Sequence, residues 1–174
     1  SPKCFECRLK SICKYCIKSN KNIKKHNNDG FTNLSNEFII HKISNNVQYI
    51  QFKKLLEYSD IITHAYTLKM DNVSFVTLND IERKNSINNY KNLCDVLNLD
   101  YVNVVKCSQT HTDNVLSVNE KINKSIPDIN NLEYSDVDGL ITNKKNLILS
   151  TTNADCILFL LFDPINRVIA NVHS

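Results

Sequence analysis

Glycine is nearly absent from this chain, which contains 2 glycines in 174 residues. Glycine is the residue that most readily adopts φ > 0, so the sequence offers few obvious positions for turns that need a left-handed backbone. Asparagine, lysine and isoleucine are abundant instead. We interpret this as a compositional bias of the source, because a shortage of glycine provides no function by itself.

Long apolar runs are also missing. A membrane-spanning helix needs roughly 20 apolar residues, whereas the longest run here, Ile157 to Phe162, has the length of a strand. The first residues, 1–4, contain no initiator Met and no apolar signal-peptide region. We therefore expect a cytoplasmic protein with no membrane partner.

The charge balance is close to neutral, with 21 Lys and Arg against 18 Asp and Glu, a net charge of +3. This gives no basis for nucleic-acid binding by the whole chain. A hydrophobic content of 42% and a charged content of 22% are typical of a globular domain. In a cytoplasmic protein the 7 cysteines are expected to be thiols, metal ligands or core residues before they are disulfides.

Composition changes near residue 35. Residues 1–35 form a Cys-rich, basic N-terminal segment and linker, and residues 36–174 form the globular part. The first segment contains a C-x2-C-x5-C-x2-C pattern made by Cys4, Cys7, Cys13 and Cys16. Paired C-x2-C motifs favour a thiolate site for Zn²⁺ or an iron–sulfur cluster. An unstructured Cys-rich tail is the alternative.

One helix is clear in the globular part, at 81–98. Apolar side chains recur there at three- and four-residue steps, at Ile87, Tyr90, Leu93, Cys94 and Leu97. Cys94 lies on this stripe and is therefore predicted to be a core thiol and not a ligand. A helical turn is expected after Phe52.

Strands account for most of the remaining pattern. We expect them at 47–52, 61–67, 101–107, 115–118, 137–141, 147–149, 157–162 and 167–173. The 157–162 segment is apolar on both faces, which predicts a central strand between covering layers, followed by a turn at Asp163–Asn166. The predicted fold class is α/β (α+β), with a mixed β-sheet core and flanking helices.

Three residues next to predicted strands carry metal-binding chemistry: His111 follows a strand, Cys156 leads into one and His173 ends one. Taken singly, each is more often a packing or surface residue. Together they supply the imidazole and thiolate groups that zinc prefers, and three protein ligands leave a fourth position open for water or substrate. We expect Asp113 and Asp155, which are close to two of these residues in sequence, to orient the ligands.

Several short motifs connect these residues. They are His64 to Ser74, Gln109-x-His111-x-Asp113-x-Val115, Asp138-Gly139-Leu140-x-Thr142, Ala154-Asp155-Cys156, and Ile169 to Ser174. In type and order they resemble the YfiH-type laccase-domain family, also called the multicopper polyphenol oxidoreductase family, from about residue 36 onward. The family pattern continues into Gly-Trp-Arg-Gly beyond the last residue here. The resemblance therefore implies a YfiH-like domain that is incomplete at its C-terminus, with His173 left close to a chain end.

This resemblance implies that His111, Cys156 and His173 are the catalytic metal ligands, with Zn²⁺ as cofactor and Cu²⁺ as the alternative. It implies purine nucleoside phosphorolysis, with purine nucleoside and phosphate as substrates. The nucleosides would be adenosine, inosine, guanosine and methylthioadenosine, with adenosine deamination as a side activity. Lys69, where the family usually has Arg, would help to hold an anion, and Gln109 would contact the base or a group behind the ligands.

Two other functions remain open at this stage. One is a copper-dependent polyphenol oxidase of laccase type, although a single three-ligand site lacks the several coppers of a true laccase. The other is a non-catalytic metal-binding fragment. His64 lies in a predicted strand, so we expect it to pack or hydrogen-bond rather than to bind metal.

Overall fold

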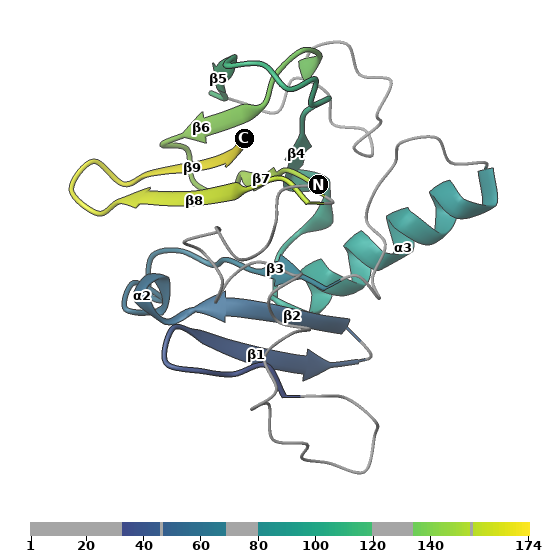
Figure 1. Cartoon of the computed structure of the whole chain (residues 1–174), viewed down its shortest axis with the longest axis vertical. Coiled ribbons are helices and arrows are strands. Elements are labelled where there is room, and N and C mark those ends of the chain that lie inside the picture. Colours follow the sequence, from purple (N-terminus) through teal and green to yellow (C-terminus); the bar gives the residue numbers. More distant parts are fainter. Residues whose placement is uncertain (1–32, 46, 69–79, 120–133, 154) are drawn as a thin grey trace. The chain divides into compact units, whose positions relative to one another are not determined.

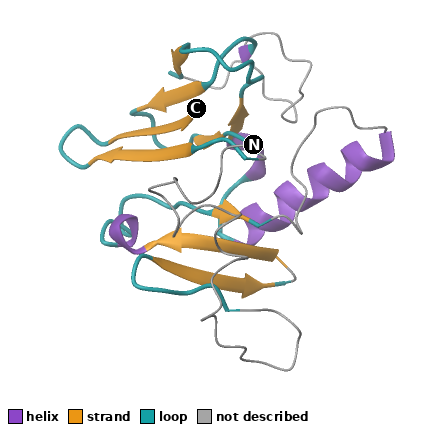
Figure 2. Cartoon of the chain, viewed as in Figure 1, coloured by secondary structure: helices purple, strands orange, loops and turns teal. Residues whose placement is uncertain are grey.

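The computed structural model describes residues 33–45, 47–68, 80–119, 134–153 and 155–174. These residues fall into two compact units. The first contains 33–42 and Tyr49–Tyr66, and the second contains Ile43–Gln48 and Thr67–Ser174. Strands predominate in the described residues, which also contain one long helix, and this mixed α+β character is the predicted fold class (Figure 2). No helix in the described part of the chain is long and apolar enough to cross a membrane.

The first three strands form a small sheet with the order β1-β2-β3. Strand β1 (Ile39–Ser44) was not predicted, β2 (Val47–Phe52) was, and β3 is limited to Tyr66–Thr67. The expected helical turn is α2 (Lys53–Leu56). His64 precedes β3 and uses its Nε2 atom to accept a hydrogen bond from the Phe52 N–H at 2.8 Å, which confirms a hydrogen-bonding role.

The middle of the second unit is a pair of short parallel strands, β4 (Val104–Lys106) and β7 (Ile148–Ser150). Alternating residues of this pair enter two different clusters. Val104 and Ile148 pack with side chains of α3 (Asp80–Val96) and of the 3₁₀ helix η1 (Tyr101–Asn103). Val105 and Leu149 pack in the other cluster, with Leu140. Since both faces are covered, β4 and β7 form the central layer.

The predicted helix is confirmed as α3, and its stripe faces the core. Tyr90 and Cys94 are buried, and Ile87 packs against the same cluster. Burial raises the pKa of the Cys94 thiol to about 11, with the nearby carboxylates of Asp95 and Asp100 adding to the effect. Cys94 is therefore a protonated core thiol, as its position on the stripe predicted.

A four-stranded sheet has the order β5-β6-β9-β8 (Figure 1). Its strands are β5 (Val115–Ser117), β6 (Gly139–Thr142), β8 (Leu158–Asp163) and β9 (Val168–His173). The β5–β6 pair is parallel, and β9 is antiparallel to both β6 and β8. The predicted turn is confirmed, because the Asp163 carboxylate accepts hydrogen bonds from the backbone N–H groups of Ile165 and Asn166.

The prediction of a central strand at 157–162 was wrong. Strand β8 is at an edge of its sheet, and the side chains of Phe159 and Leu161 are 42% and 54% exposed. The apolar residues on both faces of the 157–162 segment suggested a central strand, but the central layer is formed by the shorter strands β4 and β7.

Turns with a left-handed backbone are present despite the shortage of glycine. Six described residues other than glycine have positive φ, namely Asn45, Asn98, His111, Asp136, Asn146 and Arg167. Asn, Asp and His tolerate this region better than most side chains. Asparagine therefore occupies three of these positive-φ positions, where glycine is common in other proteins.

Candidate metal centre

The three predicted metal ligands come together in the second unit. One nitrogen of His111, one nitrogen of His173 and the sulfur of Cys156 all lie within 4.8 Å of one another. The two imidazole rings have centroids 5.0 Å apart and are tilted by 59°. His111 is exposed, Cys156 is half-buried and His173 is buried, so the cluster extends from the core to the surface.

The sheet places two of these ligands next to each other. Strand β9 ends at His173, which is paired with Leu158 in β8. One residue beyond each, Ile157 and Ser174 exchange two backbone hydrogen bonds of 3.0 and 2.9 Å. Cys156 directly precedes this pair, so the antiparallel register of β8 and β9 brings its thiol to the end of β9.

His173 is firmly held by Asp138. It is 5% exposed, and its backbone N–H donates to the Asp138 carbonyl at 2.7 Å. Its ring Nδ1 lies 2.8 Å from Oδ1 of the Asp138 carboxylate. Backbone and side chain of His173 are therefore both fixed by one residue of the neighbouring segment.

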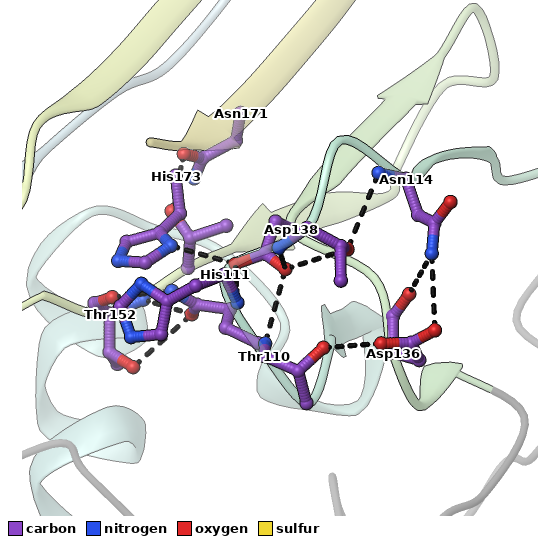
Figure 3. Close-up of polar contacts among 11 residues, drawn as sticks. Thr110, His111, Asn114, Asp136, Asp138, Thr152, Asn171 and His173 are labelled. Atoms are coloured by element: carbon purple, nitrogen blue, oxygen red, sulfur yellow. Dashed lines mark hydrogen bonds and ion pairs between the residues drawn. The ribbon is translucent and has the colours of Figure 1, made fainter.

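Asp138 also holds the segment that contains His111 (Figure 3). Its Oδ2 accepts the backbone N–H groups of Thr110 at 3.1 Å and Thr112 at 2.8 Å, and its Oδ1 accepts the His111 N–H at 3.1 Å. The Thr112 hydroxyl adds a hydrogen bond of 3.0 Å to Oδ2. Successive N–H groups that converge on one anion in this way form a backbone nest.

The carboxyl of Asp138 remains ionised at neutral pH. Burial alone would raise its pKa, but the hydrogen bonds from the Thr112 backbone, the His173 ring, the Thr110 backbone and the Thr112 hydroxyl outweigh burial and lower the pKa below its usual value. This carboxylate is only 2% exposed, and its burial is compensated by the five donor groups that point at it.

A second carboxylate holds the outer side of the same segment. Asp136 is exposed and accepts hydrogen bonds from the Thr110 hydroxyl at 2.5 Å and from the Asn114 amide at 3.2 Å (Figure 3). The Asn114 amide also donates to the Asp136 carbonyl at 2.9 Å. Asp136 thus contacts the segment that contains His111 without contacting His173.

Gln109 connects the segments that contain His111 and Cys156. Its amide oxygen accepts the Thr152 N–H at 2.7 Å, and its amide nitrogen donates to the Thr152 carbonyl, also at 2.7 Å. Asn153 then donates from its side chain to the Cys156 carbonyl at 2.7 Å. The polar groups of these segments are therefore paired with each other around the ligands.

The donor set fits a single borderline-soft cation. Zinc bonds to His nitrogen and Cys sulfur are about 2.0–2.3 Å long, which places ligand atoms roughly 3.3–3.8 Å apart around one ion. The separations of up to 4.8 Å need only a small closure of side chains, one of which is exposed. An Asp carboxylate behind a His ligand is a frequent partner in such sites. The three residues can thus hold a metal ion and leave a further position open.

The carboxylate behind the ligands is not one of those predicted. Asp113 and Asp155 are exposed, and neither has a hydrogen bond to His111, Cys156 or His173 within the described ranges. Asp113 and Asp155 do not orient the cluster, because being close to His111 or Cys156 in sequence does not direct a side chain toward it. The sequence analysis did not predict a role for Asp138, although this residue begins the Asp138-Gly139-Leu140 motif. The signal that could have found it is an acidic residue at the start of a predicted strand within the same series of motifs as His111 and Cys156.

The structure does not describe all of the predicted site residues. Lys69 and the N-terminal Cys4, Cys7, Cys13 and Cys16 lie outside the described residues. Cys107 is buried in the core, and burial raises its pKa to about 11. Among the residues that the structure describes, His111, Cys156 and His173 are the one group of this kind.

The second unit matches a known protein family. The family described as multi-copper polyphenol oxidoreductase laccase matches residues 67–174, which include His111, Cys156 and His173. The chain belongs to this family. The match begins where the main segment of the second unit begins, at Thr67.

Relatives of this laccase-family chain include proteins named purine nucleoside phosphorylase. One from Clostridium acetobutylicum is 28% identical over 129 residues, covering 74% of this chain and 48% of that protein. One from Rickettsia prowazekii is 30% identical over 138 residues, covering 79% of this chain and 47% of its own length. The chain thus spans about half the length of the curated relatives that it matches.

Two solved structures have the same fold. The hypothetical protein YfiH of Bacillus licheniformis superposes with a TM-score of 0.61 at 21% identity, covering 75% of this chain and 52% of that one. YlmD from Geobacillus stearothermophilus superposes with a TM-score of 0.51 at 18% identity, covering 87% and 52%. The predicted YfiH-like family and fold are thereby confirmed.

Proposed function

We propose that this chain carries the catalytic metal centre of a zinc-dependent purine nucleoside phosphorylase. The single observation that supports this most strongly is the convergence of His111, Cys156 and His173 in a family whose curated relatives bear that name. A bound zinc would supply a Lewis acid with an open coordination position for a phosphate or water oxygen. The three side chains would bind it, and Asp138 and Gln109 would keep their segments in place.

The proposed reaction is phosphorolysis of adenosine, inosine, guanosine or methylthioadenosine. A phosphate oxygen attacks the anomeric carbon, the bond from that carbon to the purine nitrogen breaks, and the base leaves with a proton. The products are a free base and a ribose 1-phosphate, or its methylthio derivative from methylthioadenosine. Attack of water on the ring carbon that bears the amino group of adenosine, with loss of that group as ammonia, would give inosine, which is the deaminase side activity. We propose that Lys69 helps to hold the phosphate.

The test is to incubate the purified zinc-loaded protein with adenosine and phosphate. We expect adenine and ribose 1-phosphate, with a smaller amount of inosine. Cys156→Ala should reduce product formation to background, because it removes the thiolate ligand. Cys94→Ala is the matched control, since it removes a core thiol that packs with Tyr90 and Tyr101 and is not part of the His111, Cys156 and His173 cluster, and it should retain activity. Turnover unaltered by Cys156→Ala would refute the proposal.

A copper-dependent polyphenol oxidase is the second candidate, because the family description itself names that activity. Imidazole and thiolate ligands suit copper as well as zinc. If this reading holds, the copper-loaded protein should consume oxygen with a phenolic substrate and the zinc-loaded protein should not. If neither loaded form turns over while metal still binds stoichiometrically, the chain is a non-catalytic metal-binding protein.

We also propose a separate metal site at Cys4, Cys7, Cys13 and Cys16. The support is the paired C-x2-C pattern, which suits Zn²⁺ or an iron–sulfur cluster. Replacing all four residues with serine in the full chain should lower the bound zinc or iron while leaving the metal at Cys156 in place. Unchanged metal content and an unchanged absorption spectrum would remove this site.

A further inference from the structure

Among the described residues, Asp138 alone hydrogen-bonds to both His111 and His173. It lies 35 residues before His173 and 27 residues after His111 in sequence, yet its Oδ1 accepts from the His111 N–H and lies 2.8 Å from Nδ1 of His173. Its Oδ2 meanwhile accepts from Thr110 and Thr112 on either side of His111. One buried carboxylate therefore links the two segments on which the metal centre depends.

The hydrogen bonds around Asp138 determine the tautomer of His173. The backbone N–H groups of Thr110, His111 and Thr112 can only donate, so both carboxylate oxygens are acceptors. The ring nitrogen facing Oδ1 must then be the one that carries the proton. A neutral imidazole protonated at Nδ1 has its lone pair on Nε2, and that nitrogen is free to bind a metal.

The same carboxylate supports the backbone of His111. His111 has φ of 63°, a left-handed conformation that costs a non-glycine residue free energy. The three N–H groups bound by Asp138 are those of His111 and its two neighbours, so these bonds stabilise this conformation directly. Loss of the carboxylate would therefore release the position of His111 as well as the orientation of His173.

We propose that Asp138 is the positioning residue of this centre, which sets the tautomer of His173 and the backbone of His111 together. This inference rests on the proposed metal centre, but it does not require that the centre cleave nucleosides. Asp138 is not itself a ligand, because its carboxylate oxygens are occupied by the five donors described above.

The substitution Asp138→Asn separates these effects because its outcome can be deduced. The Asn side chain can place its NH2 group at either of the two carboxylate oxygen positions. At the Oδ2 position the NH2 would face the fixed N–H groups of Thr110 and Thr112, and at the Oδ1 position it would face the fixed backbone N–H of His111 alone. We expect the second orientation, because it places the NH2 donor against fewer backbone N–H donors. The Asn NH2 then donates to Nδ1 of His173, and the proton of that ring moves to Nε2, where it blocks metal binding.

The experiment has two readouts that do not depend on enzyme activity. The first is the tautomer of His173 in the metal-free protein, read from long-range proton–nitrogen NMR correlations of its ring. We expect Nδ1–H in the unsubstituted protein and Nε2–H in Asp138→Asn. The second is zinc affinity, measured by competition with a chromophoric chelator, which we expect to fall about 10–100-fold in Asp138→Asn.

Asp136→Asn is the matched control. It alters a carboxylate two residues away that holds the same segment through Thr110 and Asn114 but does not contact His173. Its zinc affinity should stay within about threefold, as for most exposed substitutions, and the His173 tautomer should not change. A merely structural role for Asp138 would lower stability without inverting the tautomer.

Three results would overturn the inference. They are Nε2–H in the unsubstituted protein, the same tautomer in a folded Asp138→Asn variant, or equal zinc affinities of that variant and the unsubstituted protein. If Asp138→Asn does not fold, the His173 tautomer of the unsubstituted protein still tests whether Asp138 holds the proton of His173 on Nδ1. Absence of phosphorolysis with the expected tautomers and affinities would reject the proposed function and leave this inference standing.

Discussion

Gln109 uses both ends of its side-chain amide on the backbone of Thr152. Replacing it with methionine keeps the length of the side chain and removes its polar atoms. The N–H and C=O of Thr152 then lose this partner in a half-buried environment, and we expect the free energy of unfolding to fall by about 1–3 kcal/mol. Urea denaturation in the presence of a chelator measures this loss without a contribution from metal.

Gln109→Glu provides the comparison for that measurement. A carboxylate can still accept from the Thr152 N–H, but its second oxygen faces the Thr152 carbonyl oxygen in place of a donor, so we expect Gln109→Glu to lower the free energy of unfolding as well. Stability of Gln109→Met equal to that of the unsubstituted protein would show that the two hydrogen bonds with Thr152 do not stabilise the fold.

At the residue scale, the cluster of His111, Cys156 and His173 was predictable and the carboxylate behind it was not. His111, Cys156 and His173 could be found because imidazole and thiolate are uncommon groups with a specific chemistry, and the surrounding motifs have a recognisable order. Asp138 acts through three backbone N–H groups, and their direction depends on a left-handed residue at 111. Residue type does not report that direction, which is why Asp113 and Asp155 were predicted instead.

At the scale of elements, strand β6 begins at a glycine because its neighbours approach closely. A Cβ atom on Gly139 would lie 2.9 Å from Cγ2 of Val115 in β5 and 3.2 Å from Cγ2 of Val172 in β9. We expect Gly139→Ala to lower the free energy of unfolding by about 1–3 kcal/mol through overpacking. Thermal or urea unfolding of the variant measures this.

The double variant Gly139→Ala with Val115→Ala tests the cause. It removes the valine methyl groups from the 2.9 Å contact, and Val115 is itself exposed, so the double variant should recover part of the lost stability. Additive losses from the two substitutions would contradict the packing explanation.

Prediction of the elements succeeded where periodicity was long and failed where burial depended on other layers. Helix α3 has several turns of a regular stripe, so its position could be predicted. Strands β4 and β7 have three residues each, which is too few to show that both of their faces are covered. Strand β8 has a longer apolar run and was therefore assigned the central place that these short strands occupy.

At the scale of the whole molecule, buried acidic groups predict a loss of stability at alkaline pH. Burial raises the pKa of the Cys94 and Cys107 thiols from 9.0 to about 11, and that of the Tyr90 and Tyr101 phenols from 10.0 to about 12. The unfolded chain loses these protons first. Their contribution to stability is therefore full below pH 9 and is lost as pH rises through 11 to 12.

Lys106 acts in the opposite direction. Burial lowers the pKa of its amine from 10.5 to about 8, so the folded state releases this proton first and gains stability between pH 8 and pH 10.5. The stability lost through the two thiols and two phenols exceeds the stability gained through this one amine. We therefore expect the urea midpoint to fall above about pH 9, and to fall more steeply in Lys106→Met. A midpoint that rises from pH 9 to pH 11 would contradict this account.

The composition of the chain also explains how its turns are made. Asn45, Asn98 and Asn146 each adopt a left-handed backbone where most proteins would use glycine. These positions are open to improvement, because a glycine there would relieve a conformational cost at little risk to the centre. His111 is different, since glycine would remove the ligand together with the cost. If His111 binds metal as proposed, a gain in stability at this position would cost a ligand, so stability and the proposed activity make opposite demands on this residue.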